Sequence, residues 1–125
     1  MIITDKKTGK EIDAKLPKHF KTKWIKALRS GEYIQGQAQL ENNKKYCCLG
    51  VACKISDPQL DISGRGLITK SHFGDLIETL KIPKLLIGTI DKSSNDFNIV
   101  VTTLVKMNDI GKSFDEISTW IETHL

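Results

Sequence analysis

The stretch around which we expect the fold to form is Tyr46-Cys47-Cys48-Leu49-Gly50-Val51-Ala52-Cys53. It is the most compact apolar run in the first half of the chain, and it holds all three cysteines. Small apolar side chains at these spacings predict a buried helix from Cys48 to Ile55, after a strand that ends at Tyr46-Cys47. Gly50 inside this helix indicates that another stretch of backbone passes close by. Asp57-Pro58 is expected to end the helix.

The composition is typical of one soluble globular domain. The chain has 125 residues, 39% of them hydrophobic and 27% charged, which is enough to bury a single core. No apolar run approaches the roughly 20 residues that span a bilayer, and the first residues do not resemble a secretion signal. An odd number of cysteines, two of them adjacent, favours reduced thiols in a cytoplasm over disulfides.

The net charge of +4 is unevenly distributed. Residues 1–54 hold twelve Lys and Arg against five Asp and Glu, a formal charge of +7, whereas residues 55–125 carry −3. A basic first half is compatible with an anionic partner, but it is equally typical of a solvated face. Lysines outnumber arginines and few aromatic residues lie among them, which favours the solvated face.

The first half of the chain predicts a hairpin, a helix and a polar loop. Residues 1–14 form two short extended runs around a turn in which Gly9 can take a positive φ. The clearest helix covers residues 18–29, because it follows Pro17 and stops at Ser30-Gly31. Residues 32–45 are expected to be a loop with a short strand near Ala38-Gln39-Leu40 and a turn at Asn42-Asn43.

The second half is less regular before its end. Residues 59–70 are predicted to be a surface loop or small hairpin, and residues 71–80 a helix that Ser71 caps. A short strand is expected over residues 85–90, followed by a turn at residues 92–95. Residues 97–107 suit a strand by composition and a helix by spacing, and the helix is preferred.

The last helix has the firmest signals. Ser113 and Glu116 form a capping box at its start. Its apolar side chains repeat along one face and are Phe114, Ile117, Ile121 and Leu125. We therefore expect a single, mainly helical α+β domain over residues 1–125, with four or five helices and a small β element. Residues 1–15 would be a hairpin extension on a core formed by residues 16–125.

Three separated motifs resemble a family of small, mostly uncharacterised proteins that bacteriophages and prophages encode. They are Trp24–Tyr33 with Gln35, then Tyr46–Val51, then Leu104 with Asn108–Ile117. The resemblance covers most of residues 18–125, although residues 56–100 match only loosely and the hairpin is additional. It implies an accessory protein in the cytoplasm of an infected bacterium. It implies no reaction and no catalytic residues.

The cysteines suggest a nucleophile, and a packing role is the competing interpretation. A thiol at a helix amino terminus can have a lowered pKa, and His19 or His72 with Asn108 or Asp109 would complete a relay. Buried small cysteines are common in cores, so packing is favoured and we expect no catalytic residue. The spacing of Cys47, Cys48 and Cys53 lacks the two-to-four-residue gap of a zinc site, so no metal is expected.

A ligand site is the other possibility for these motifs. Free backbone N–H groups at the start of the last helix can bind an anion, with Lys112 adding charge. The alternative is that Gly111-Lys112-Ser113 only turns one helix into the next. The candidate ligand-binding residues are Tyr46, Cys47, Cys48, Asn108, Asp109, Lys112 and Ser113.

The helix over residues 18–29 offers a second, anionic site. Its candidate residues are Lys18, Lys23, Lys26 and Arg29. The competing interpretation is again a solvated face on an amphipathic helix. A helix-turn-helix is disfavoured, because the last helix carries Asp115, Glu116 and Glu122 and no Lys or Arg that would face DNA phosphates.

Together these features predict a non-enzymatic accessory binding protein of phage origin that needs no cofactor. Its partner would be a host protein or a nucleotide signal, and it would antagonise a host defence. One alternative is a cysteine-dependent enzyme that uses Cys47 or Cys48. Another is a nucleic-acid-binding module that uses the basic first helix, for which only weak binding is expected. The oligomeric state is open, and no membrane is involved.

Overall fold

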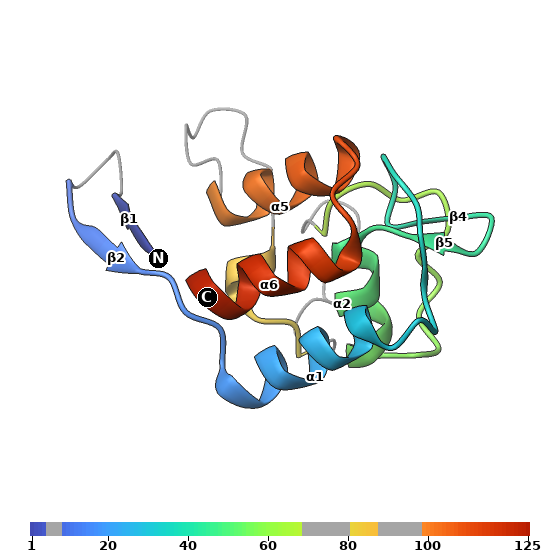
Figure 1. Ribbon diagram of the computed structural model, residues 1–125, viewed down its shortest axis with the longest axis horizontal. Coiled ribbons are helices and arrows are strands. Elements are labelled where there is room, and N and C mark those ends of the chain that lie inside the picture. The colour runs from blue at the N-terminus through green and yellow to red at the C-terminus, as the bar shows by residue number, and fades with distance from the viewer. Residues whose placement is uncertain (5–8, 69–80, 88–98) are drawn as a thin grey trace.

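The computed structural model describes residues 1–4, 9–68, 81–87 and 99–125 (Figure 1). The predicted helix over residues 71–80 and the predicted turn at residues 92–95 lie outside these residues. The described helices are α1 (Lys18–Arg29), α2 (Cys48–Ser56), the 3-10 helix η1 (Lys84–Leu86), α5 (Ile99–Asp109) and α6 (Phe114–His124). The strands are β1 (Ile2–Thr4), β2 (Glu11–Asp13), β3 (Ile34–Gln35), β4 (Glu41–Asn42) and β5 (Lys45–Tyr46).

The four α-helices of the described residues pack on one another. In Figure 1, α6 lies between α1 and α5, while α2 contacts both α1 and α5. The β1–β2 hairpin and the β3–β5–β4 sheet lie at opposite ends of this helical layer (Figure 1). The predicted mainly helical α+β class is therefore confirmed.

The helix α1 has the predicted bounds and buries one face. Trp24 and Leu28 point into the core, and Trp24 is fully buried. The indole N–H of Trp24 donates to the backbone carbonyl of Cys48 at 3.0 Å, so its only polar atom is satisfied. Gly31, in the expected stop, has φ +78. The contact with Cys48 fixes α1 against α2.

The helix α2 runs one residue beyond its predicted end and is the most buried element. Its first six residues are all buried, and Asp57 ends it in an extended conformation. The prediction for Gly50 is confirmed, because the backbone of Leu40 lies against its Cα. A Cβ at this position would overlap the Leu40 carbonyl oxygen and lie 2.8 Å from its carbon. Only glycine fits without a shift of the backbone.

The small sheet corrects the predicted strand near residues 38–40. Strand β5 pairs in parallel with β3 and antiparallel with β4, two residues in each case. Ala38 has φ +70, which is incompatible with an extended strand, and strand β4 begins only at Glu41. The tight turn between β4 and β5 uses Asn43 and Lys44, both with positive φ, one residue later than predicted.

Two further predictions need correction. Residues 59–68 are irregular, as expected, but Ile62 and Ile68 are fully buried, so this segment covers the core and is more than a surface loop. The predicted strand over residues 85–90 is wrong at its start. Pro83 with φ −55 precedes a single 3-10 turn, and Leu86 of that turn is buried.

The carboxy-terminal helices agree with the sequence. Residues 99–109 form α5, so the preference for a helix over a strand is confirmed, and the helix ends two residues later than predicted. Ser113 and Glu116 form both bonds of the capping box at α6. The four predicted apolar side chains of this helix face are all buried. The β1–β2 hairpin is confirmed, with Gly9 at φ +69, and the amino group of Met1, directly before β1, donates to the backbone carbonyl of His124 in α6 at 2.8 Å.

Candidate functional site

The sequence motifs meet at the buried side chain of Asn108, near the end of α5. Its Oδ1 atom accepts from the backbone N–H of Cys48 at 3.2 Å, and its Nδ2 donates to Gly36 O at 2.7 Å. Asn108 is fully buried, so each of these bonds replaces a contact with water. The side chain ties α5 to the start of α2 and to the loop after β3.

Gln35 completes this junction. Its Nε2 donates to Asn108 Oδ1 at 3.1 Å and to Lys112 O at 2.6 Å, while its Oε1 accepts from Phe114 N–H at 3.0 Å. One amide therefore joins β3 to the end of α5 and the start of α6. The signal that could have predicted this role was present, since Gln35 belongs to the first of the three motifs. These contacts give all three motifs a shared structural role.

The thiols of the junction are buried and held in place. Cys47 caps α2, and its Sγ accepts from Gly50 N–H at 3.4 Å. The Cys48 thiol donates a hydrogen bond from its Sγ to the backbone carbonyl of Leu104 at 3.7 Å. Cys47, Cys48 and Cys53 are all free and buried. The prediction that Cys48 and Cys53 are buried is confirmed.

Burial determines the protonation of these thiols. It raises the pKa of Cys47 despite the backbone N–H groups at the helix start, which favour the thiolate. Burial and the neighbouring Cys47 raise the pKa of Cys48 well above its usual value, and burial raises that of Cys53 to about 12. The thiols are therefore protonated at neutral pH, which is the unreactive form.

The hollow beside Cys47 is small. Its volume is about 170 Å³, and its walls include Leu40, Val105 and Asp109. Asp109 Oδ1 accepts from Ala38 N–H at 3.0 Å, so this carboxylate holds the loop. No hydrogen bond joins either Cys47 or Cys48 to a histidine within the described residues. His72, one of the predicted relay residues, lies outside them.

The other predicted ligand-binding residues are engaged by the protein itself. Ser113 Oγ accepts from Glu116 N–H at 3.1 Å, and Lys112 Nζ pairs with the Glu116 carboxylate at 3.5 Å. The Ser113 N–H, and then Lys112, lower the pKa of Glu116. Tyr46 makes an edge contact with Tyr33, with ring centroids 5.3 Å apart. The start of α6 thus has its own carboxylate and an amide oxygen where an anion would bind.

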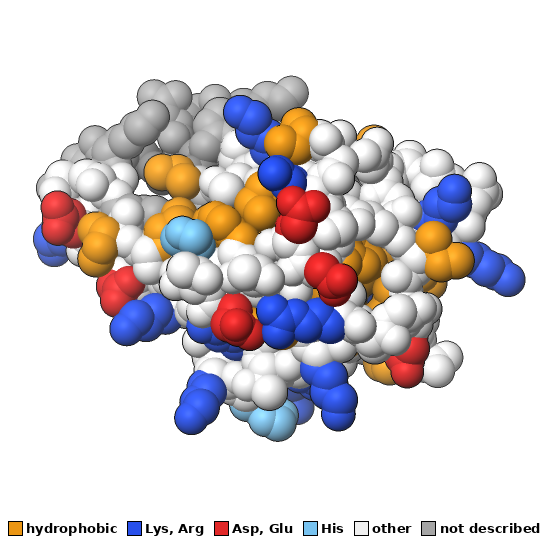
Figure 2. All heavy atoms as spheres, viewed as in Figure 1, with side chains coloured by type: hydrophobic (Ala, Val, Ile, Leu, Met, Phe, Trp, Pro, Cys, Tyr) orange, Lys and Arg blue, Asp and Glu red, His pale blue; other side chains and the backbone are white. Residues whose placement is uncertain are grey.

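A larger hollow lies along α1 where it faces α6, and we call it the basic groove. Its volume is about 680 Å³. It is lined by Lys18, Lys21, Thr22, Ile25, Lys26, Arg29, Ser30 and Glu122. Four cations and one carboxylate give this lining a formal charge of +3. Figure 2 shows Lys and Arg side chains spread over α1, with acidic side chains next to them over α6.

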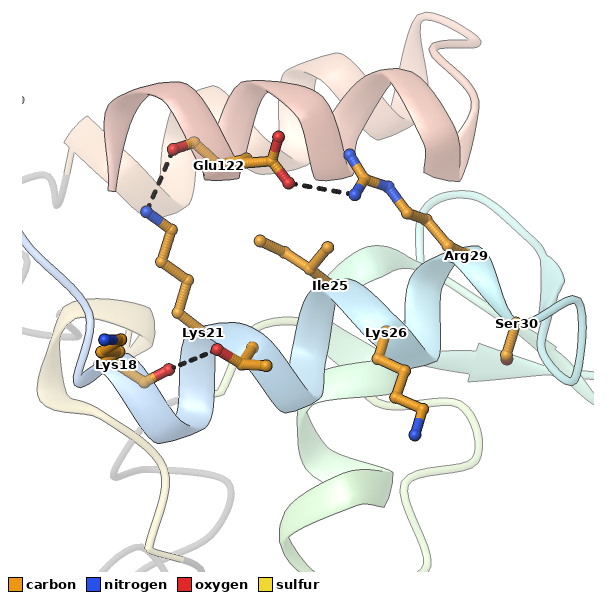
Figure 3. A pocket seen from close by; sticks show the side chains of 8 residues that line it. Lys18, Lys21, Ile25, Lys26, Arg29, Ser30 and Glu122 are labelled. Carbon is orange, nitrogen blue, oxygen red and sulfur yellow. Dashed lines mark hydrogen bonds and ion pairs between the residues drawn. The ribbon is translucent and has the colours of Figure 1, made fainter.

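Two of these cations are fixed to α6 (Figure 3). Arg29 Nε donates to Ser118 Oγ at 2.9 Å, and its Nη1 pairs with Glu122 Oε2 at 3.1 Å. Lys21 Nζ donates to the backbone carbonyl of Glu122 at 3.1 Å. Ile25 lies between these two side chains. Lys21 and Arg29 therefore form walls around a half-buried apolar residue.

The remaining cations differ in their environment. Lys18 and Lys26 are exposed, and neither forms an ion pair within the described part of the chain. Lys23 does not line the groove, since its Nζ donates to Ile55 O at 3.2 Å. The structure thus brings together three of the four predicted anion-binding residues. Sequence reasoning missed Ile25 and Glu122, because the α1–α6 pairing joins segments about ninety residues apart.

Metal-binding clusters and membrane-spanning helices are both absent from the described residues. No group of three or more His, Cys, Asp or Glu side chains is placed there to hold a metal ion. No described helix has both the length and the apolar character needed to cross a membrane.

The chain belongs to a family described as a domain of unknown function, DUF8296, whose model matches residues 16–125. The match begins directly after the β1–β2 hairpin and includes both the Asn108 junction and the basic groove. No curated protein and no solved structure matches the chain.

Proposed function

We propose that this protein is a non-enzymatic binding protein that holds an anionic partner in the basic groove. The observation that carries the proposal is the pair of exposed lysines, Lys18 and Lys26, that line the basic groove together with Ile25. Unpaired cations beside a partly buried apolar side chain are a typical binding surface, since a partner gains from both charge and burial.

The Asn108 junction supports this proposal over a cysteine-dependent enzyme. Burial raises the pKa of Cys47 and Cys48, whereas a cysteine nucleophile needs a lowered pKa. The amides of Gln35 and Asn108 are also fully used in holding the fold. The junction is better suited to positioning α1 and α6 than to chemistry.

The resemblance to phage-encoded proteins supplies the biological part of the proposal. The partner would be a molecule in the cytoplasm of the infected bacterium, and binding would antagonise a host defence. Binding of an anion in the basic groove does not require this setting, since it depends only on the residues of the groove.

Charge reversal of the groove tests the proposal. The probes are fluorescent acidic peptides, a short single-stranded DNA and a fluorescent ATP analogue, each titrated at low ionic strength. We expect at least one class to bind, and Lys18→Glu/Lys26→Glu to weaken it about tenfold or more. The matched control is Lys84→Glu/Lys106→Glu, which reverses two exposed lysines outside the groove. If no probe distinguishes the two variants, the proposal is wrong.

A further inference from the structure

The start of α1 carries charge of the wrong sign for a helix amino terminus. Its first turn contains Lys18 and Lys21 and no acidic residue, and Pro17 provides no side-chain cap. The helix dipole places partial positive charge at this end, so the two lysines are unfavourable there. Within the described residues, no carboxylate pairs with Lys18. A carboxylate from a partner would therefore be stabilised at this point.

The remaining donors of the groove are poorly placed for a phosphate. All the guanidinium nitrogens of Arg29 bond to α6, since Nη2 also donates to Thr119 Oγ1 at 3.4 Å. The Lys21 ammonium is also engaged already, since it donates to a backbone carbonyl. Lys18 and Lys26 are eight residues apart, about 12 Å along the helix axis. A single phosphate group is too small to bridge them.

The centre of the groove is apolar. Ile25 is half-buried, and Figure 3 shows it between the aliphatic stems of Lys21 and Arg29. Lysine and arginine stems are themselves apolar, so they extend the surface that Ile25 presents. An apolar side chain of a partner would lose its contact with water here.

The geometry points to an acidic amphipathic helix of a partner protein as the occupant of the basic groove. Its apolar stripe would pack on Ile25, and two carboxylates seven or eight residues apart would reach Lys18 and Lys26. A helix as long as α1 spans about 18 Å, so a segment of about 12 residues fills the groove. This inference rests on the proposed function, because it assigns the partner of the same surface.

A displayed library of random peptides of about 16 residues tests this assignment. The protein selects binders, with counter-selection on Lys18→Glu/Lys26→Glu. We expect a consensus with acidic residues seven or eight positions apart and Leu, Ile or Phe between them. A synthetic consensus peptide should become helical on binding. Its affinity should be about tenfold or more lower for Lys18→Glu/Lys26→Glu than for the wild type. The affinity of the peptide should also fall for Ile25→Ser. The Lys84→Glu/Lys106→Glu control should bind the peptide with the affinity of the wild type.

Other outcomes overturn the inference in distinguishable ways. If the oligonucleotide or the ATP analogue binds with the same Lys18 and Lys26 dependence and no such peptide is selected, the groove holds a phosphate ligand and the proposed function stands. If Ile25→Ser leaves the affinity of the selected peptides unchanged, charge alone drives binding, and an amphipathic helix is not the partner. If neither peptide nor phosphate probe depends on Lys18 and Lys26, the inference and the proposed function both fail.

Discussion

At the scale of single residues, Gly50 sets how closely α2 approaches the backbone of Leu40. A methyl group at this position would overlap the Leu40 carbonyl oxygen, and backbone cannot move aside as a flexible side chain can. We expect Gly50→Ala to lower the free energy of unfolding by about 3 kcal/mol or more. Chemical denaturation measures the change.

Gly66 provides the matched control for this prediction. A Cβ built on Gly66 meets nothing within 4 Å, and its φ is not in the left-handed region. Gly66→Ala should therefore leave the unfolding midpoint almost unchanged. Equal effects of the two substitutions would mean that the contact with Leu40 does not require glycine at position 50, since helix propensity alone favours alanine there.

Asn108 is the second residue on which the fold depends. Asn108→Ala leaves the Cys48 N–H and the Gly36 carbonyl without partners in a buried site. Each unsatisfied group costs about 1–3 kcal/mol, so we expect the two together to lower the free energy of unfolding by about 2–6 kcal/mol. The exposed Asn42 supplies the control, since Asn42→Ala removes an amide that no buried group needs. A loss below about 1 kcal/mol for Asn108→Ala would show that water replaces the amide.

At the scale of elements, α6 forms part of the core and also one wall of the groove. Phe114 is only 7% exposed and lies at the first turn, beside the Gln35 contact. Phe114→Ala should cost about 3–5 kcal/mol of unfolding free energy, because it opens a cavity under α6. Denaturant midpoints of the variant and the wild type give the value.

The control for α6 is Ile110→Ala, in the turn before it. Ile110 is 65% exposed, so its truncation should change the midpoint very little. If Phe114→Ala were equally harmless, α6 would not be anchored in the core. The wall that Glu122 contributes to the groove would then lack support.

At the scale of the whole molecule, local sequence signals predicted most of the described helices. They did not predict how segments far apart in the sequence pack on one another. The capping box at Ser113, the stop at Gly31 and the apolar spacing of residues 48–55 each lie within one element, so the sequence alone shows them. The two-residue strands have no alternation to detect, which explains the error near residue 38. The burial of Ile62 and Ile68 depends on tertiary packing, and the short segment that holds them has no regular period that predicts which of its apolar side chains are buried.

The same division applies to the two candidate sites. The motifs containing Cys48 and Asn108 were visible in the sequence, and their meeting point was anticipated as a ligand site. Their bonds to Gln35 and Gly36 depend on how β3 is placed, which no local pattern gives. The lysines of α1 were likewise visible. Which cations of α1 are held in place is decided by the contacts of Lys21 and Arg29 with Glu122, and the sequence of α1 alone does not show these contacts.

The buried thiols make the stability of the whole molecule sensitive to alkaline pH. In the unfolded chain a cysteine ionises with a pKa near 9.0, whereas burial raises that of Cys53 to about 12 and raises those of Cys47 and Cys48. Above pH 9 the unfolded state therefore binds fewer protons than the folded state. The contribution of the buried thiols to the free energy of unfolding is fully present below pH 9. It falls as the pH rises further, by up to about 1.4 kcal/mol per pH unit for each thiol.

Burial also raises the pKa of Tyr33 and Tyr46, which adds to the loss in the same direction at higher pH. Unfolding free energies between pH 8 and pH 11 measure the slope, and Cys53→Ala isolates one thiol. This variant starts from a lower stability because it leaves a cavity, so the slopes and not the absolute values are compared. Above pH 9 we expect a slope shallower by up to about 1.4 kcal/mol per pH unit. Identical slopes would mean that Cys53 ionises as easily in the folded protein as in the unfolded chain, against its burial in α2.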